Sequence, residues 1–162
     1  MPVIDVTHNL DTLTITITAE FAAPVERIWQ VYADPRQLEQ VFGPPGYPAT
    51  FVEHDLIPGG SAHYFMTSPE GERHYGFWRI TAVDEPHSIA FEDGFAADDT
   101  FTPEKDLPVS QNVYVFEAID GGTRATFTAT YDSAEALQKV LEMGVVDGVA
   151  SSIDQIDTLV AA

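Results

Sequence analysis

Six short segments between Ala49 and Tyr131 read as β-strands, and polar or turn-forming residues separate each from the next. The segments are rich in β-branched and aromatic residues and cover residues 49–57, 61–68, 73–83, 88–95, 111–119 and 123–131. Turn signals such as Pro58-Gly59-Gly60 lie between them. Because no helical pattern intervenes, successive strands are expected to pair antiparallel. The run therefore predicts an antiparallel sheet rather than a β-α-β fold.

One further strand and two short helices are expected before this run. Residues 12–21 alternate apolar and threonine side chains, as in a half-buried strand. Apolar residues then recur at helical spacing over 25–32 and again over 34–42, where Asp34 is placed to cap the second helix. The sequence Gly-Pro-Pro-Gly at 43–46 ends that helix. Helices this short need packing partners to be stable.

The C-terminal part of the chain changes to a helical period. Residues 135–159 predict one long amphipathic helix, with Asp132 as a possible cap and Gly144 as a possible kink. Its apolar stripe consists of Val146, Val149, Ile153, Ile156 and Val160. Such a stripe needs an apolar surface to cover it.

These elements predict an α+β fold in one domain over residues 1–162. A curved antiparallel sheet of about seven strands would wrap around the long C-terminal helix, with two short helices between strands 1 and 2. One helix cannot fill both ends of a curved sheet equally. We therefore expect a cavity between the sheet, the C-terminal helix and the two short helices, which would form its lid.

The net charge of −19 limits the partners of the chain. With 26 acidic residues against 7 basic ones, it would be repelled by nucleic acids and by anionic membranes, so neither is expected as a partner. No apolar run has the length of a membrane span. Cysteine is absent, which excludes disulfides and favours a cytoplasmic location.

Five segments, in this order and spacing, resemble a known family. They are "FAAPVERIWQVYADPRQLEQVFGPPG" (21–46), "DLIPGG" (55–60), "VDEPHSIAFED" (83–93), "VFEAIDGGTRATFT" (115–128) and "GVVDGVASSIDQIDTLV" (144–160). The chain resembles the activator of Hsp90 ATPase homologue 1-like branch of the START/Bet v 1-like (SRPBCC) superfamily. The resemblance implies the helix-grip fold.

The sequence departs from the usual pattern of this branch at three places. Val41-Phe42 stands where a Trp-rich pair is usual, Ile57 where an Arg is frequent, and Val145 where a Trp commonly follows the glycine. All three places are expected at or near the lid and the cavity mouth.

The resemblance implies three possible functions. The first is binding of a small apolar or amphipathic molecule in the cavity, without catalysis. The alternative is a cyclase- or hydrolase-like enzyme that uses a carboxylate in the pocket. A stress-related chaperone cofactor of an Hsp90-type ATPase is the third, although a chain of this size leaves no room for a separate docking domain.

The residues expected to contact the ligand are mostly aromatic, because aromatic walls bind apolar molecules and tyrosine and tryptophan add polar groups. They are Trp29, Phe42, Tyr64, Met66, Trp78, Phe91, Asp93, Phe116, Phe127, Val145 and Val149. Asp93 should share a face with Phe91, and a buried carboxylate there would have a raised pKa and could act as an acid or base. The alternative is a structural carboxylate, either at a strand end near water or hydrogen-bonded to the lid.

The predicted strand over residues 111–119 is apolar on both faces at its middle. Either Val113 and Val115 or Tyr114 and Phe116 must point outward from their strand, which suggests a covered outer face and a possible homodimer.

Three histidines, His54, His63 and His74, fall on neighbouring strands. Strand parity turns His63 away from the cavity, so no metal and no cofactor is expected.

The charge leads to a first prediction. Crowded acidic side chains repel one another, so added salt should raise the melting temperature by screening them. Thermal melts from low to moderate sodium chloride measure this. A flat melting temperature would show that the acidic residues are too widely spaced to matter.

Overall fold

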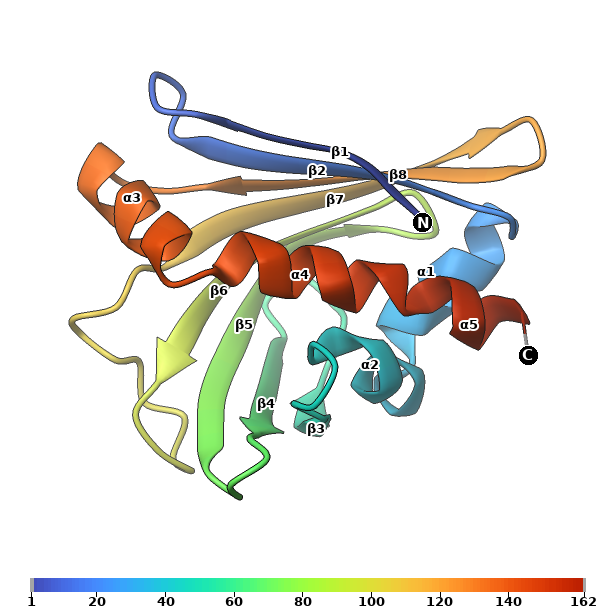
Figure 1. Cartoon of the computed structure of the whole chain (residues 1–162). Coiled ribbons are helices and arrows are strands. Elements are labelled where there is room, and N and C mark those ends of the chain that lie inside the picture. The colour runs from blue at the N-terminus through green and yellow to red at the C-terminus, as the bar shows by residue number, and fades with distance from the viewer. Residues whose placement is uncertain (1, 162) are drawn as a thin grey trace.

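The computed structural model describes residues 2–161, which form one antiparallel sheet with helices on its concave side (Figure 1). The strands are β1 (Val3–Asn9), β2 (Thr14–Phe21), β3 (Ala49–His54), β4 (Ser61–Thr67), β5 (Arg73–Asp84), β6 (Ser88–Ala96), β7 (Ser110–Ile119) and β8 (Gly122–Thr130). The helices are α1 (Val25–Ala33), α2 (Pro35–Phe42), α3 (Ala134–Glu142), α4 (Val145–Asp154) and α5 (Ile156–Ala161). The architecture is α+β and agrees with the helix-grip fold.

The sheet has eight strands in the order β1-β2-β8-β7-β6-β5-β4-β3, whereas the sequence predicted about seven. The additional strand is β1, which pairs with β2 at one edge of the sheet. Only Val3 in β1 is partly buried, and the rest of the strand is exposed. Because β1 has almost no buried face, its sequence lacks the alternation that identified the other strands.

The C-terminal helix is broken into α3, α4 and α5, so the prediction of one continuous helix was wrong. Gly144 separates α3 from α4 with a left-handed φ of 74°, a conformation that glycine adopts without strain. The kink expected at this glycine is confirmed. Ser133, and not Asp132, caps α3, since its hydroxyl accepts a hydrogen bond from the Ala136 amide at 3.0 Å.

α4 and α5 run across the concave face of the sheet, as Figure 1 shows. Ile153 and Ile156 are buried in the core, while Val146 and Val149 are partly buried against it. Within residues 2–161 no helix is both long and apolar enough to cross a membrane.

Helices α1 and α2 cover one end of the concave face. The Asp34 carboxylate caps α2 by accepting a hydrogen bond from the Arg36 amide at 2.9 Å. Gln37 donates a side-chain hydrogen bond to the same carboxylate at 3.1 Å. The short helices predicted from the sequence are therefore present, and each buries apolar residues such as Ile28 and Leu38.

The strand β7 has Phe116 and Tyr114 on its inner face and Val113 and Val115 on its outer face. Val113 is 44% and Val115 is 37% exposed. The ambiguity left by the sequence is resolved in favour of outward valines. A homodimer contact on this face stays a prediction.

The second prediction tests the packing of the C-terminal helices. Ile153 is 4% exposed, so Ile153→Asp places a carboxylate in the core and should destabilise the protein by about 4 kcal/mol or more. Urea unfolding measures the loss. Asp157→Asn, at an exposed position of α5, is the control and should change the stability very little. A near-neutral Ile153→Asp would contradict this packing.

Candidate functional site

A cavity of about 310 Å³ lies between the sheet, α2 and the C-terminal helices. α2 contributes Leu38, Val41 and Phe42 to its wall, and α4 contributes Val145 and Val149. The inner face of the sheet closes the other side through β4, β6 and β7. The lining is mainly apolar, with a few polar groups that belong to tyrosine, serine and one aspartate.

The structure divides the eleven residues predicted to bind ligand into two groups. Six line the cavity, namely Phe42, Tyr64, Met66, Asp93, Val145 and Val149. The other five, Trp29, Trp78, Phe91, Phe116 and Phe127, lie in the packed core outside the lining and are at most 4% exposed. A contact between a ligand and any of the six stays a prediction.

The five core residues lie away from the cavity because other aromatic rings cover them. Trp78 stacks on Phe91 with 4.1 Å between ring centroids. Trp29 packs edge-on against Phe116 and donates its indole N–H to the Glu85 carboxylate at 3.1 Å. The signal available from the sequence was an inward direction on a strand, or on the apolar side of a helix for Trp29. Neither distinguishes a ring in the core from one that borders a cavity.

Three tyrosines line the cavity that sequence analysis did not assign to it, and the first, Tyr32, lies on α1. Tyr114 lies on β7, where the sequence left the facing side open, and Tyr131 directly follows β8. Tyr114 packs edge-on against Tyr32 and Phe127. Strand parity could have indicated Tyr114 once the outward direction of Val113 was known.

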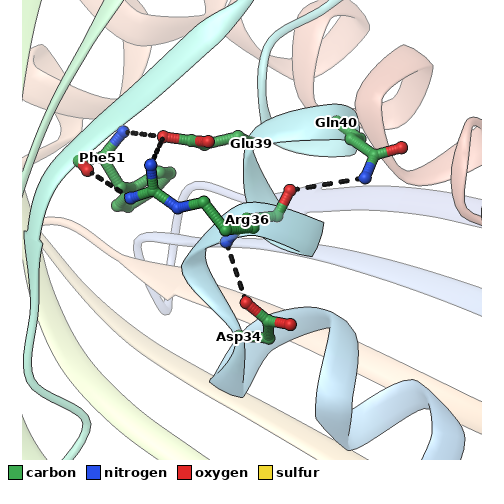
Figure 2. A network of polar contacts seen from close by, with 5 residues as sticks. All are labelled: Asp34, Arg36, Glu39, Gln40 and Phe51. Carbon is green, nitrogen blue, oxygen red and sulfur yellow. Dashed lines mark hydrogen bonds and ion pairs between the residues drawn. The ribbon is translucent and has the colours of Figure 1, made fainter.

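Polar contacts fix α2, the helical wall of the cavity, to the edge strand β3 (Figure 2). Arg36 donates a hydrogen bond to the Phe51 carbonyl at 2.9 Å, and the Phe51 amide donates one to Glu39 at 2.7 Å. An ion pair of 3.4 Å joins Arg36 to Glu39. These side chains satisfy both backbone groups of Phe51 at an otherwise unpaired strand edge.

The C-terminal end of α2 is held by the last helices. The side-chain amide of Gln155 donates hydrogen bonds to the backbone carbonyls of Gly43 at 2.8 Å and Val41 at 3.3 Å. A side chain at Gly43 would clash with the carbonyl of Tyr47, so the chain turns here only because this residue is glycine. Opening of the predicted lid would have to break these contacts.

Tyr64 reaches Asp93 across a glycine on the intervening strand. Tyr64 on β4 is paired with Gly76 on β5, and a Cβ at position 76 would lie 2.5 Å from the phenol ring. The missing side chain leaves room for the ring to lie over β5. The phenol hydroxyl then donates a hydrogen bond to Asp93 at 2.9 Å.

Asp93 faces the cavity, as the parity with Phe91 predicted, and it is only partly buried because the cavity borders it. Burial raises its pKa to about 7, although hydrogen bonds from Tyr64 and the Gly94 amide act in the opposite direction. Burial also raises the pKa of Tyr64 and Tyr114, and the nearby Asp93 charge adds to this effect. Asp93 can therefore gain or lose a proton near neutral pH while the phenols stay protonated.

The histidines lie outside the cavity lining. His63 stacks on Phe101 at 4.6 Å and pairs with Glu53 at 3.2 Å on the other face of the sheet. His54 contacts the Tyr32 carbonyl through Nε2 at 2.7 Å, and burial lowers its pKa. Within the described residues 2–161, no three His, Cys, Asp or Glu side chains are grouped as metal ligands.

The three departures from the family pattern differ in position. Val41, Phe42 and Val145 line the cavity, as expected. Ile57 is 53% exposed in the turn after β3 and is not part of the lining. The departures at α2 and α4 therefore bear on the shape of the cavity, and the one at Ile57 does not.

The chain belongs to the family described as activator of Hsp90 ATPase homolog 1-like protein, whose model matches residues 22–161. It is similar to the crystal structure of protein Ms6760 from Mycobacterium smegmatis, with 68% identity over 98% of this chain and 96% of that one, and a TM-score of 0.91. The solution structure of a protein from Arthrobacter aurescens is also similar, with 39% identity over 98% of this chain and 91% of that one, and a TM-score of 0.93. Among curated proteins, none matches.

The third prediction concerns the pKa of Asp93. Its folded-state pKa of about 7 exceeds the ordinary value of 3.8, so ionisation disfavours the folded state. This penalty is absent below about pH 4, grows as the pH rises to about 7, and is complete above it. Asp93→Asn removes the penalty. The free energy of unfolding of the variant minus that of wild type should therefore be larger above pH 7 than at pH 4, by on the order of 4 kcal/mol.

Urea unfolding of both proteins from pH 4 to pH 8 measures this change. Asp99→Asn makes the same substitution at an exposed position and should follow the wild-type profile. Parallel profiles for wild type and Asp93→Asn would contradict the raised pKa.

Proposed function

We propose that the protein binds a small apolar or amphipathic molecule in the cavity between the sheet, α2 and α4. The observation that carries this proposal is a partly enclosed, mainly apolar cavity of about 310 Å³ with very few polar groups. Pockets for small molecules have this composition, with apolar walls for affinity and isolated polar groups for orientation. Membership of a family that commonly binds hydrophobic ligands supports it.

A second candidate is an enzyme of the cyclase or hydrolase type. The Tyr64–Asp93 pair favours it, because a carboxyl with a pKa near 7 can exchange protons with a bound substrate at neutral pH. Among residues 2–161, no histidine and no second acidic residue joins Asp93 in the lining to complete a familiar catalytic set. Binding without turnover is therefore the first choice.

The fourth prediction tests the cavity with a thermal-shift screen of apolar and amphipathic metabolites. A ligand present at about 100 times its Kd should stabilise the folded protein by about 2.7 kcal/mol, which is about 5 to 10 °C in melting temperature. Val149→Phe fills part of the cavity and should abolish the shift. Val52→Phe adds the same ring at an exposed position on β3 and should leave it intact.

Mass spectrometry of each hit after incubation separates the two candidates. Recovery of the unchanged compound supports binding, and conversion that is lost in Asp93→Asn supports catalysis. No hit, together with a crystal structure in which side chains fill the cavity, would contradict both.

A further inference from the structure

The ionisable side chains that line the cavity indicate which amphipathic molecules it would bind. Asp93 is its only ionisable side chain other than the tyrosines, and no Lys, Arg or His belongs to the lining formed by the described residues. A bound carboxylate or phosphate would have no cation to pair with and would lie near a carboxylate. The electrostatics of the site therefore favour a positively charged group.

The hydrogen bonding of Asp93 points to the same conclusion. Its carboxyl accepts one side-chain hydrogen bond, from Tyr64 to Oδ1, and a backbone contact from Gly94. An ionised carboxylate offers about four acceptor positions, so acceptor capacity remains on this cavity-lining group. An ammonium group, which carries only donors, would complement it.

Aromatic side chains surround this carboxylate. Tyr64, Tyr114 and Tyr131 lie close enough to Asp93 for its charge to raise the pKa of each phenol. Phe42 lines the same cavity and packs edge-on against Tyr64, with 4.9 Å between centroids. Aromatic rings attract organic cations through their quadrupoles, and here they also provide apolar contact for a hydrocarbon chain.

From these observations we infer that the ligand is a small organic cation, an amine whose ammonium group pairs with Asp93 and whose apolar part lies against α2 and α4. This inference rests on the proposed binding function and specifies its ligand class. The net charge of −19 supports it further, because it raises the concentration of cations near the protein and repels anionic amphiphiles.

The inference implies a pH dependence of binding with a definite sign. Alkylamines stay protonated to about pH 10, whereas Asp93 ionises only as the pH rises through about 7. The titratable groups that face Asp93 from β4, β7 and the end of β8 are the phenols of Tyr64, Tyr114 and Tyr131, whose raised pKa values keep them neutral. Amine affinity should therefore increase between pH 5.5 and pH 8.

The test compares three probes with the same chain, octylamine, octanol and octanoate, by isothermal titration calorimetry. At pH 8 octylamine should bind about ten-fold more tightly than octanol, and octanoate should bind most weakly. Asp93→Asn should remove the preference for the amine. Asp99→Asn, which removes one exposed carboxylate, should change amine affinity by less than about two-fold and so controls for attraction to the acidic surface.

The possible outcomes separate this inference from the proposed function. Equal or tighter binding of octanol or octanoate would overturn the amine assignment and leave the binding function intact. An amine preference that survives in Asp93→Asn would also overturn it, since the cation would then be held elsewhere. Failure of all three probes to bind would count against both, and the thermal-shift screen would then show whether another apolar ligand binds.

Discussion

The cavity depends on how side-chain size changes along the C-terminal helices. The large residues Ile153 and Ile156 fill the concave face near α5, and the aromatic core packs beneath them. Ile153 borders the cavity, and toward the start of α4 the lining consists of the smaller residues Val145, Gly148 and Val149. Close packing would need larger residues there. The same helical layer thus completes the core at one end and leaves a cavity at the other.

The buried carboxyl of Asp93 is costly for stability, and two features lessen the cost. Gly76 leaves room for the Tyr64 ring, and the phenol donates a hydrogen bond to the carboxylate in addition to the one from the Gly94 amide. Burial nevertheless dominates, since the pKa is raised to about 7 in spite of that bond. An apolar residue at position 93 would fit the lining at lower cost. A costly polar group retained in an apolar cavity is typical of binding and catalytic sites.

Much of the fold follows from the sequence, because each central strand carries an alternating pattern and each turn carries glycine or proline. β1 was missed because it buries almost nothing. The break between α4 and α5 at Gln155 was missed because the apolar stripe from Val146 to Val160 continues in phase through it. The site was less predictable. Strand alternation predicts that Phe91 and Asp93 lie on the same side of the sheet. It does not predict that Trp78 stacks on Phe91 while Asp93 lines the cavity.

The acidic surface and Asp93 would have different parts in binding a cation. Most of the 26 acidic residues contact solvent, and at physiological salt their field decays over about 8 Å. They can increase the rate of encounter but hold no ligand in one orientation. Asp93 is partly buried in the cavity wall, and its contacts with a cation would be screened less than those at the surface. Added salt should therefore slow association and leave dissociation from the cavity nearly unchanged, which is the behaviour of a site whose selectivity comes from one buried carboxylate and not from the net charge.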